Sequence, residues 1–541
     1  MFSFIKNIFS LRDENSSNHR ENANANPPKE ENIGISSILE DNKKSLYKTF
    51  NNSPDLIIRE VKIANNPAFT SMLVYIDNMI EKSLIEQSVI GKLTKKNEDT
   101  SLNPGSKEYS QYLLGVRNED IYTDINKVID SILSGKLVQF IDGIAEALII
   151  NINNPPSRSI EEPEVETAIR GPREGFTESI STNITLIRKK IKSTNLKIES
   201  LKLGRETRTD ISIIYLSNIV NKKIVAELKE RLSKIDINAV LGINYIKEYI
   251  DDNPLSAFPT IFSTERPDVA AGKLLEGRIA IFVDGTPVIS TVPALFIEFM
   301  LTNEDYYINF IPATINRLIR YISLILSFIL PGSYVAVVTF HQELIPTPLL
   351  ITIIKARSGV PYPALTECIL LLLAFEVLRE AGVRMPRTVG QAISVVGALI
   401  LGQAAVEAGL VSTPMVIVVA VTAIASFAVP STDMLSAITL PRFLFIILGG
   451  SFGLLGLTCG ILILLMKLIS MRSFGVPYMG PLAPVITDEL ADVFIRRPHW
   501  NKFKRSWLIV GRKSIKKEPL SRINSIKVEH EKAINDKDKK E

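Results

Sequence analysis

Hydrophobic residues are concentrated in one long block of the chain. Between Tyr321 and Met466 only twelve residues are charged, about 8% of that stretch, against about 27% of the remaining chain. A helix needs about twenty residues to cross a bilayer, and each of four runs without a formal charge is close to that length. The pattern predicts a polar protein with a block of membrane helices before its C-terminal segment. The four runs are residues 321–340, 388–406, 408–432 and 443–466.

Two further apolar pieces break this pattern. Residues 361–379 carry Glu367 and Glu376, and residues 349–354 are too short to span, which is typical of a re-entrant or interfacial piece. Glu376 is one helical turn from Arg379, so one interpretation is an ion pair near the membrane surface. The other is a carboxylate that faces a wet cavity, because acids inside a membrane usually face the bundle interior.

Small residues recur every fourth position in two of the uncharged runs, which lets helix backbones approach closely. This suits ordinary bundle packing, and also an oligomer with weakly polar faces around an opening. Pro331 and Gly332 interrupt the first run and are candidate hinge residues, because such residues allow kinks. The candidate pore-lining residues are Glu367, Glu376, Gln391 and Gln403.

The positive charges that flank the block conflict with five full crossings. Basic residues are expected on the cytoplasmic side, and five crossings would place the C-terminal segment outside. Residues 496–507 alternate basic and aromatic side chains, as at a membrane–water interface. We therefore expect the C-terminal segment inside and an even number of crossings, from four to six, with residues 361–379 falling short.

The region before the block contains a weak internal repeat. Residues 73–82 align with residues 213–222, and residues 135–143 align with residues 277–285. In each copy a strand-like run ends in a polar tip and a helical pattern follows, which predicts two small α/β folds near residues 50–155 and 195–290. Each later run ends in Asp-Gly, a signature of tight hairpin turns, at Asp142-Gly143 and Asp284-Gly285.

A loop between the two copies is rich in glycine, proline and arginine. Its side chains Arg170, Arg173 and Glu174 suit a structured contact between subdomains or subunits. Anion binding is the alternative, although the loop lacks the Lys-Ser/Thr ending of a phosphate loop. Arg266, with acidic neighbours on both sides, is expected to form a salt-bridged corner of the same kind of contact.

The remaining chemistry excludes several functional classes. The four histidines and two cysteines are not at metal-ligand spacing, and no catalytic or nucleotide motif is present. A net charge of +4 is too small to indicate a nucleic-acid partner. We therefore expect no enzyme, no cofactor, no metal and no catalytic residue.

These observations predict a multi-domain membrane protein with two repeated α/β, thioredoxin-like subdomains followed by an all-α polytopic domain. The start has no signal peptide, so we expect the soluble part in the cytoplasm. A short amphipathic anchor at residues 1–11 is an alternative to a wholly disordered start. The expected domains are a disordered segment 1–49, subdomains 50–165 and 166–300, a membrane domain 301–480 and a basic cytosolic tail 481–541.

Five long stretches resemble the A subunit of the GerA-type spore germinant receptors. One of them reads EVETAIRGPREGFTESISTNITLIRKKI, and the resemblance covers roughly residues 50–490. It implies a protein of the inner membrane of bacterial spores, with both terminal regions on the spore-core side. The stretches are residues 164–191, 263–288, 331–353, 375–420 and 470–484.

The resemblance also implies partners and a mechanism. The expected partners are a transporter-like B subunit, a lipoprotein C subunit, membrane lipid and further copies of this chain, arranged as a pentameric ring. Nutrient binding would open a cation path through that ring and trigger germination. Two rival functions stay open: a solute carrier, and a non-conducting scaffold or coupling subunit of the receptor.

Overall fold

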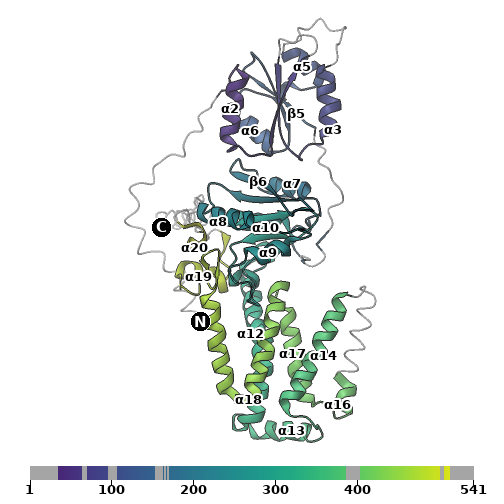
Figure 1. The fold of residues 1–541 in the computed structure, drawn as a ribbon, viewed down its shortest axis with the longest axis vertical. Coiled ribbons are helices and arrows are strands. Elements are labelled where there is room, and N and C mark those ends of the chain that lie inside the picture. Colours follow the sequence, from purple (N-terminus) through teal and green to yellow (C-terminus); the bar gives the residue numbers. More distant parts are fainter. Residues whose placement is uncertain are drawn as a thin grey trace, which may run out of the picture. The chain divides into compact units, whose positions relative to one another are not determined.

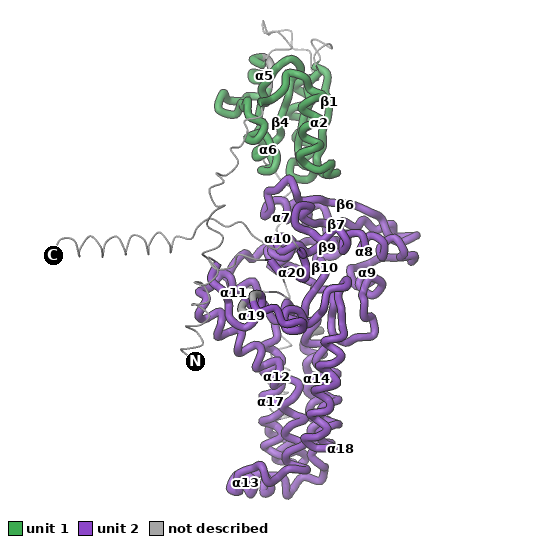
Figure 2. Tube along the Cα trace, turned by 90° about the vertical axis from the view of Figure 1, so that its left-hand side faces the viewer, with its two compact units in different colours: residues 1–156 green, residues 157–541 purple. Residues whose placement is uncertain are grey.

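The structure is a computed structural model in which residues 34–63, 70–94, 107–152, 162–163, 166, 170–384, 402–499 and 505–511 are described. The chain divides into two compact units, residues 1–156 and residues 157–541 (Figure 2). The first unit holds one α/β copy. The second unit holds the other copy together with the long helices.

The first copy is built on a five-stranded sheet with strand order β1-β2-β4-β5-β3. Side chains of β2 alternate between its faces: Met72 packs with α2 and α6, and Leu73 packs with α3 and α4. Helices thus cover both faces, which explains why β2 is apolar at nearly every position. The elements are α2 (Leu39–Thr49), β1 (Leu56–Lys62), β2 (Thr70–Ile76), α3 (Lys82–Ile85), η2 (Glu86–Ile90), α4 (Gly91–Thr94), α5 (Lys107–Leu114), η3 (Asn118–Asp120), β3 (Ile121–Tyr122), α6 (Ile125–Leu133), β4 (Leu137–Ile141) and β5 (Ala147–Ile150).

The second copy has the same plan, with strand order β6-β7-β9-β10-β8. Its elements appear in the same sequence along the chain, so the predicted repeat is confirmed. They are α7 (Ile180–Lys190), β6 (Leu196–Leu203), β7 (Thr209–Leu216), α8 (Lys222–Ser233), α9 (Ile243–Ile250), β8 (Phe262–Thr264), α10 (Pro267–Leu275), β9 (Ile279–Val283) and β10 (Ile289–Val292).

The repeat begins earlier than the sequence comparison indicated. In α2, Asn42 accepts a hydrogen bond from the Ser36 backbone N–H at 3.0 Å and donates to the Ser36 carbonyl at 2.6 Å. In α7, Asn183 makes the same two bonds with Thr177, at 2.8 and 2.6 Å. The first copy therefore includes α2, and the expectation of disorder through residue 49 is wrong for Leu39–Thr49.

The two Asp-Gly pairs lie in hairpins, as predicted. Gly143 (φ 84°) follows β4 and Gly285 (φ 85°) follows β9, and within each pair only the glycine has a positive φ. Each turn is also tied to the segment before the first helix, since Gly285 N–H donates to Glu178 O at 2.8 Å and Gly143 N–H to Ser37 O at 2.9 Å. The connecting loops are longer than the tight turns that the sequence predicted.

The thioredoxin-like label is wrong at the level of strand pairing. Every pairing between the described strands of the two sheets is antiparallel. A thioredoxin-like sheet contains parallel neighbours. The broader class, two small α/β copies followed by a helical region, is confirmed.

Long helices follow the second copy and run beside one another (Figure 1). Two helices, α12 and α18, are long and apolar enough to cross a membrane by length and composition, and α17 is shorter but apolar. The elements are η4 (Phe296–Met300), α11 (Glu304–Tyr307), α12 (Phe310–Phe340), η5 (Gln342–Leu344), α13 (Thr347–Arg357), α14 (Ala364–Arg384), α16 (Ala405–Glu407), α17 (Thr413–Phe427), α18 (Thr432–Ser470), β11 (Arg472–Ser473), β12 (Val476–Pro477), α19 (Thr487–Phe494) and α20 (Trp507–Val510).

Helix α18 is a helical hairpin and not one continuous rod. Gly453 has φ 64° and ψ −146°, outside the helical region of backbone space. A Cβ atom on Gly460 would lie 2.8 Å from the Phe445 ring, although fifteen residues of straight helix span about 22 Å. The chain therefore doubles back at Gly453, and arms 432–452 and 454–470 lie side by side.

The uncharged runs of the sequence do not coincide with these helices. Run 443–466 contains the tip of the hairpin, and run 408–432 contains the turn at Gly409 and the loop after α17. Run 321–340 is only the later part of α12, and most of run 388–406 lies outside the described residues. The mismatch arises because a charged residue marks the end of a membrane helix only if its charge must face water. Arg442 is buried in the middle of an arm, so it does not mark an end.

The segment after α18 returns to the second copy. Phe474, Val493, Ile509 and Val510 belong to the same hydrophobic core as strands β7 and β9. The expected boundary at residue 480 is therefore wrong, because α19 and α20 are packed parts of the second unit. Residues 512–541 lie outside the described residues.

Candidate functional site: buried charges between the second copy and the helices

Two arginines on the first turns of α12 point into protein. Asn309 caps this helix, with its side chain accepting a hydrogen bond from the Ile311 N–H at 3.1 Å. Arg317 and Arg320 are three residues apart, so they lie on the same side of the helix. Arg317 is 0% exposed, which is rare for a charged side chain unless it is paired.

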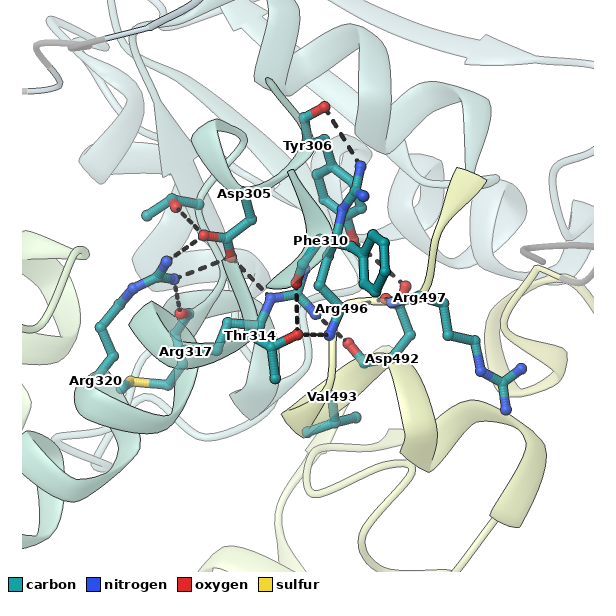
Figure 3. Close-up of polar contacts among 12 residues, drawn as sticks. Asp305, Tyr306, Phe310, Thr314, Arg317, Arg320, Asp492, Val493, Arg496 and Arg497 are labelled. Carbon is teal, nitrogen blue, oxygen red and sulfur yellow. Dashed lines mark hydrogen bonds and ion pairs between the residues drawn. The ribbon is translucent and has the colours of Figure 1, made fainter. Parts of the chain in front are cut away.

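Asp305, just before α12, pairs with both arginines. Arg317 Nε donates to Asp305 Oδ2 at 2.8 Å, and Arg320 donates to both carboxylate oxygens. Asp492 of α19 completes the group: Arg317 Nη1 donates to its carbonyl at 2.5 Å and lies 3.5 Å from its Oδ1 (Figure 3). These four residues, Asp305, Arg317, Arg320 and Asp492, form what we call the junction cluster.

Aromatic and backbone groups close over the junction cluster. The Tyr306 ring lies between two guanidinium groups, 5.4 Å from Arg317 and 5.5 Å from Arg496. The backbone N–H of Arg496 donates to Thr314 Oγ1 at 3.2 Å (Figure 3). Within the junction cluster the two arginines bind the two aspartates, so helix α12, the segment before it and α19 are held together.

The α18 hairpin is also attached to the second copy at both of its ends. Lys247 of α9 donates to Asp433 Oδ2 at 3.3 Å in the first turn of α18. Just beyond the hairpin, Ser473 Oγ donates to Thr260 O at 2.7 Å and accepts from the Ala294 N–H at 3.1 Å. The hairpin is therefore held to the second copy before its first arm and after its second.

A cavity of about 1290 Å³ lies between the second copy, α11 and the start of α18. On its wall Arg266 Nε donates to Asp268 at 3.0 Å and Tyr307 Oη donates to Asp268 at 2.8 Å. Burial disfavours a charge on Asp268, yet these hydrogen bonds hold its pKa below the ordinary value. Burial also lowers the pKa of Lys273, although the Glu298 carboxylate beside it opposes the shift.

Glu166 is the most perturbed carboxyl on the cavity wall. Burial raises its pKa to about 7, and the hydrogen bond from Thr264 Oγ1 at 2.5 Å only partly offsets this. Near neutral pH this side chain therefore changes charge within the structure.

Comparison with known proteins identifies the family. Residues 44–507 match the family described as Bacillus/Clostridium GerA spore germination protein. The chain belongs to the GerA spore germination protein family.

Several proteins similar to this GerA family member are known by name. Spore germination protein KA of Bacillus subtilis (strain 168) is 45% identical over 479 residues, 88% of each chain. Spore germination protein GerLA of Bacillus cereus is 36% identical over 445 residues, 82% of this chain and 90% of that one. The uncharacterized membrane protein YfkQ of B. subtilis (strain 168) is 40% identical over 471 residues, 87% of this chain and 91% of that one.

One solved structure is also similar. The crystal structure of the N-terminal domain of the A subunit of the Bacillus megaterium spore germinant receptor GerK3 is 35% identical to this GerA family member. The match covers 49% of this chain and 97% of the chain in the crystal structure, with a TM-score of 0.38.

The loop residues expected to form a contact lie on the second copy. Arg170 and Arg173 are exposed, with Arg173 Nε 3.8 Å from Glu162, and Glu174 accepts from Lys190 at 2.8 Å. Arg266 forms the predicted salt-bridged corner with Asp268 and donates to the Pro172 carbonyl at 3.3 Å. Whether this loop contacts another subunit stays a prediction.

The acidic pore candidates of the GerA family member are both engaged within the chain. Glu367 is 0% exposed and accepts hydrogen bonds at 2.6 Å from the N–H and Oγ of Ser412, which caps α17. Glu376 accepts from Arg442 at 2.7 Å and pairs with Arg379 at 2.5 Å. Of the two interpretations, the structure contains the pair with Arg379, and the sequence did not indicate the second partner, Arg442.

The two glutamines and the hinge candidates have different surroundings. Gln403 is exposed and donates to Glu407 at 3.0 Å, whereas Gln391 lies outside the described residues. Pro331 and Gly332 lie inside α12, where both are buried. A Cβ atom on Gly332 would lie 2.6 Å from the Phe445 carbonyl oxygen of α18.

Sequence reasoning missed the junction cluster. Arg317 and Arg320 are among the positive charges that flank the apolar block, which from the sequence indicate only membrane orientation, and no pattern singles out Asp305 or Asp492. Asp492 is 172 residues beyond Arg320, so no local pattern joins them. The one available signal is the presence of two arginines three residues apart at the start of an apolar helix.

Proposed function

We propose that this chain is the A subunit of a nutrient-responsive spore germinant receptor and forms a nutrient-gated cation channel. Copies of the chain would surround the ion path as a ring, a pentamer, in the inner membrane of the spore. The helical region would cross the membrane several times, with both terminal regions on the spore-core side. A transporter-like B subunit and a lipoprotein C subunit would complete the receptor.

The observation that carries the proposal is the junction cluster. A gated channel needs a rigid connection between the part that receives a signal and the helices that move. Arg317 and Arg320 of α12 are bound to Asp305 and Asp492 by buried, charge-assisted hydrogen bonds. Such bonds resist separation, because parting them leaves a buried charge without a partner. Movement of the second unit's α/β copy would therefore reach α12.

The test is the variant Asp305→Asn, which keeps the shape and removes the charge that binds both arginines. The variant would be expressed with its B and C partners in non-sporulating cells, and potassium efflux recorded after addition of candidate nutrients. We expect the complex to assemble and the nutrient-triggered efflux to fall by about tenfold or more. The matched control is Asp236→Asn, which weakens the exposed Arg205–Asp236 pair (66% and 62% exposed) and should leave efflux unchanged.

A non-conducting coupling subunit is the second candidate. It is favoured by the engagement of Glu367 and Glu376 with partners in the same chain: Ser412 binds one oxygen of Glu367, and Arg442 and Arg379 bind Glu376. Nutrient-triggered efflux that requires this chain would contradict this function. An assembled complex that restores germination without any efflux would support it and would contradict the channel. A solute carrier would instead transport without unitary currents.

A further inference from the structure

The middle of α12 contains a backbone carbonyl that its own helix cannot satisfy. Pro331 has no N–H, so the carbonyl of Ser327, four residues earlier, loses its usual helical partner. Ser327 is 0% exposed, so water does not replace the missing donor. A buried carbonyl of this kind needs another donor, because leaving it unpaired costs as much as a lost hydrogen bond.

Arg442 supplies the missing donor from another helix. Its Nε donates to the Ser327 carbonyl at 2.7 Å, and its side chain is 0% exposed. The same guanidinium donates through Nη1 to Glu376 Oε1 of α14 at 2.7 Å. Glu376 is held on its other oxygen by Arg379 at 2.5 Å. One arginine of the first α18 arm thus joins the Ser327 carbonyl of α12, which Pro331 leaves without a helical donor, to Glu376 of α14.

Close backbone contacts near Arg442 leave little room for α12 and α18 to pack in another way. A Cβ atom on Gly332 would lie 2.6 Å from the Phe445 carbonyl oxygen, and one on Gly449 would lie 2.5 Å from the Gly332 carbonyl oxygen. The two helices therefore touch through their main chains at Gly332, within about two helical turns after Arg442 on α18. Packed interfaces of this kind have discrete arrangements, since they do not deform continuously.

We propose that Arg442 is a positioning residue that locks α12 at the Pro331 gap in its hydrogen bonding, and that Glu376 transmits the state of this lock to α14. This assigns Glu376 a role through Arg442, distinct from its earlier interpretation as a pore-lining group. The lock itself rests on the contacts above. Its consequence, that releasing Arg442 raises ion leak without nutrient, rests on the proposed channel function.

The central variant is Arg442→Gln, which frees the Ser327 carbonyl and one oxygen of Glu376. Because a lone buried carboxylate can hinder folding, the double variant Glu376→Gln/Arg442→Gln removes both charges together. Pro331→Ala gives residue 331 an N–H for the Ser327 carbonyl, so Arg442→Gln should have a much smaller effect in that background. Arg379→Gln is the matched control, because Arg379 touches Glu376 but not Ser327 among the described contacts.

The direct readout is a distance between two spin labels on α12, one on each side of Pro331. It is measured in the full chain with its partners. Labels would be placed at Leu318 and Phe340, both exposed on α12, after Cys368 and Cys459 are replaced by alanine. Labelled chain would be diluted with unlabelled chain, so that distances are measured within one copy. We expect Arg442→Gln and the double variant to shift or broaden the distance distribution, Arg379→Gln to leave it unchanged, and Pro331→Ala to suppress the effect of Arg442→Gln.

Unchanged distances in both Arg442 variants, or an equal change in Arg379→Gln, would overturn the lock. The second readout is potassium efflux without nutrient, which we expect to rise by about tenfold in Arg442→Gln. A changed distance with unchanged efflux would keep the lock and count against the channel. If the Arg442 variants conduct normally and their spin-label distances across Pro331 are unchanged, the proposed function stands and the lock is rejected.

Discussion

At the scale of single residues, the second unit surrounds its buried charged side chains with opposite charges and hydrogen-bond donors. Asp305 accepts from two guanidinium groups, and Glu298 from Lys273 and Arg278. A buried charge that loses its partner is destabilising by about 3–5 kcal/mol, whereas the intact pair is close to neutral. Such clusters therefore fix one arrangement of their helices more than they add to net stability.

Glu166 differs because no described lysine or arginine forms an ion pair with it, and its pKa is raised to about 7. A carboxyl with a pKa raised on folding stabilises the folded state below its ordinary value of 4.5. That contribution is lost as the pH rises through about 7. We expect thermal stability of the purified chain to fall between pH 5 and pH 8, by up to roughly 3 kcal/mol from this group.

Glu166→Gln should flatten that part of the pH profile, because the amide keeps an acceptor for Thr264 and does not ionise. The measurement is the thermal midpoint of both proteins from pH 5 to pH 8. Parallel profiles for the two proteins would show that Glu166 ionises normally.

At the scale of elements, α18 illustrates how one backbone conformation creates two helices. Gly453 adopts φ 64° and ψ −146°, which residues with a side chain rarely reach, and its missing Cβ leaves room for His341. The second arm packs against the first through Gly456 and Gly460, where any Cβ would collide with residues of the first arm. The hairpin thus depends on glycines that look like ordinary packing residues in the sequence.

We expect Gly453→Ala to lower the stability of the detergent-purified chain by about 1–3 kcal/mol, because of backbone strain and the 2.7 Å approach to His341 Cε1. Thermal unfolding measures this. Gly359→Ala is the matched control, since nothing lies within 4 Å of a Cβ there and its φ is not positive. Equal stability of the two variants would contradict the hairpin.

At the scale of the whole molecule, the two copies share a topology but differ in how their cores are completed. The first copy has its own hydrophobic clusters on the two faces of its sheet, formed entirely by residues 34–152. The core of the second copy includes Phe474, Val493, Ile509 and Val510 from beyond the helices. The second copy and the C-terminal segment are therefore expected to fold together.

We expect a fragment of residues 34–156 to unfold cooperatively by itself. A fragment of residues 170–300 should be much less stable or should aggregate, because it exposes the apolar surface that the C-terminal segment covers. Joining residues 471–511 to it through a flexible linker should restore a cooperative transition. Circular dichroism during thermal unfolding distinguishes these cases, and a fully stable 170–300 fragment would refute the shared core.

The sequence by itself determined the composition of each region and the existence of the repeat. Both are local properties: a low charge density over 321–466 is unsuited to water, and the aligned stretches 73–82 and 213–222 share an apolar run followed by a polar tip. It also determined the turns at Gly143 and Gly285, since their conformation favours glycine. The family resemblance, which the comparisons confirmed, drew on the same stretches.

Only the tertiary structure decided where the helices begin, end and reverse. Arg442 precedes the uncharged run 443–466 in the sequence, but inside the fold its charge is matched by Glu376 and its Nε by a carbonyl that Pro331 leaves free. Asp305 and Asp492 have no pattern in common, yet they meet on Arg317. The physical reason is that a buried charge is acceptable only with a partner, and the partner is chosen by the packing of distant segments.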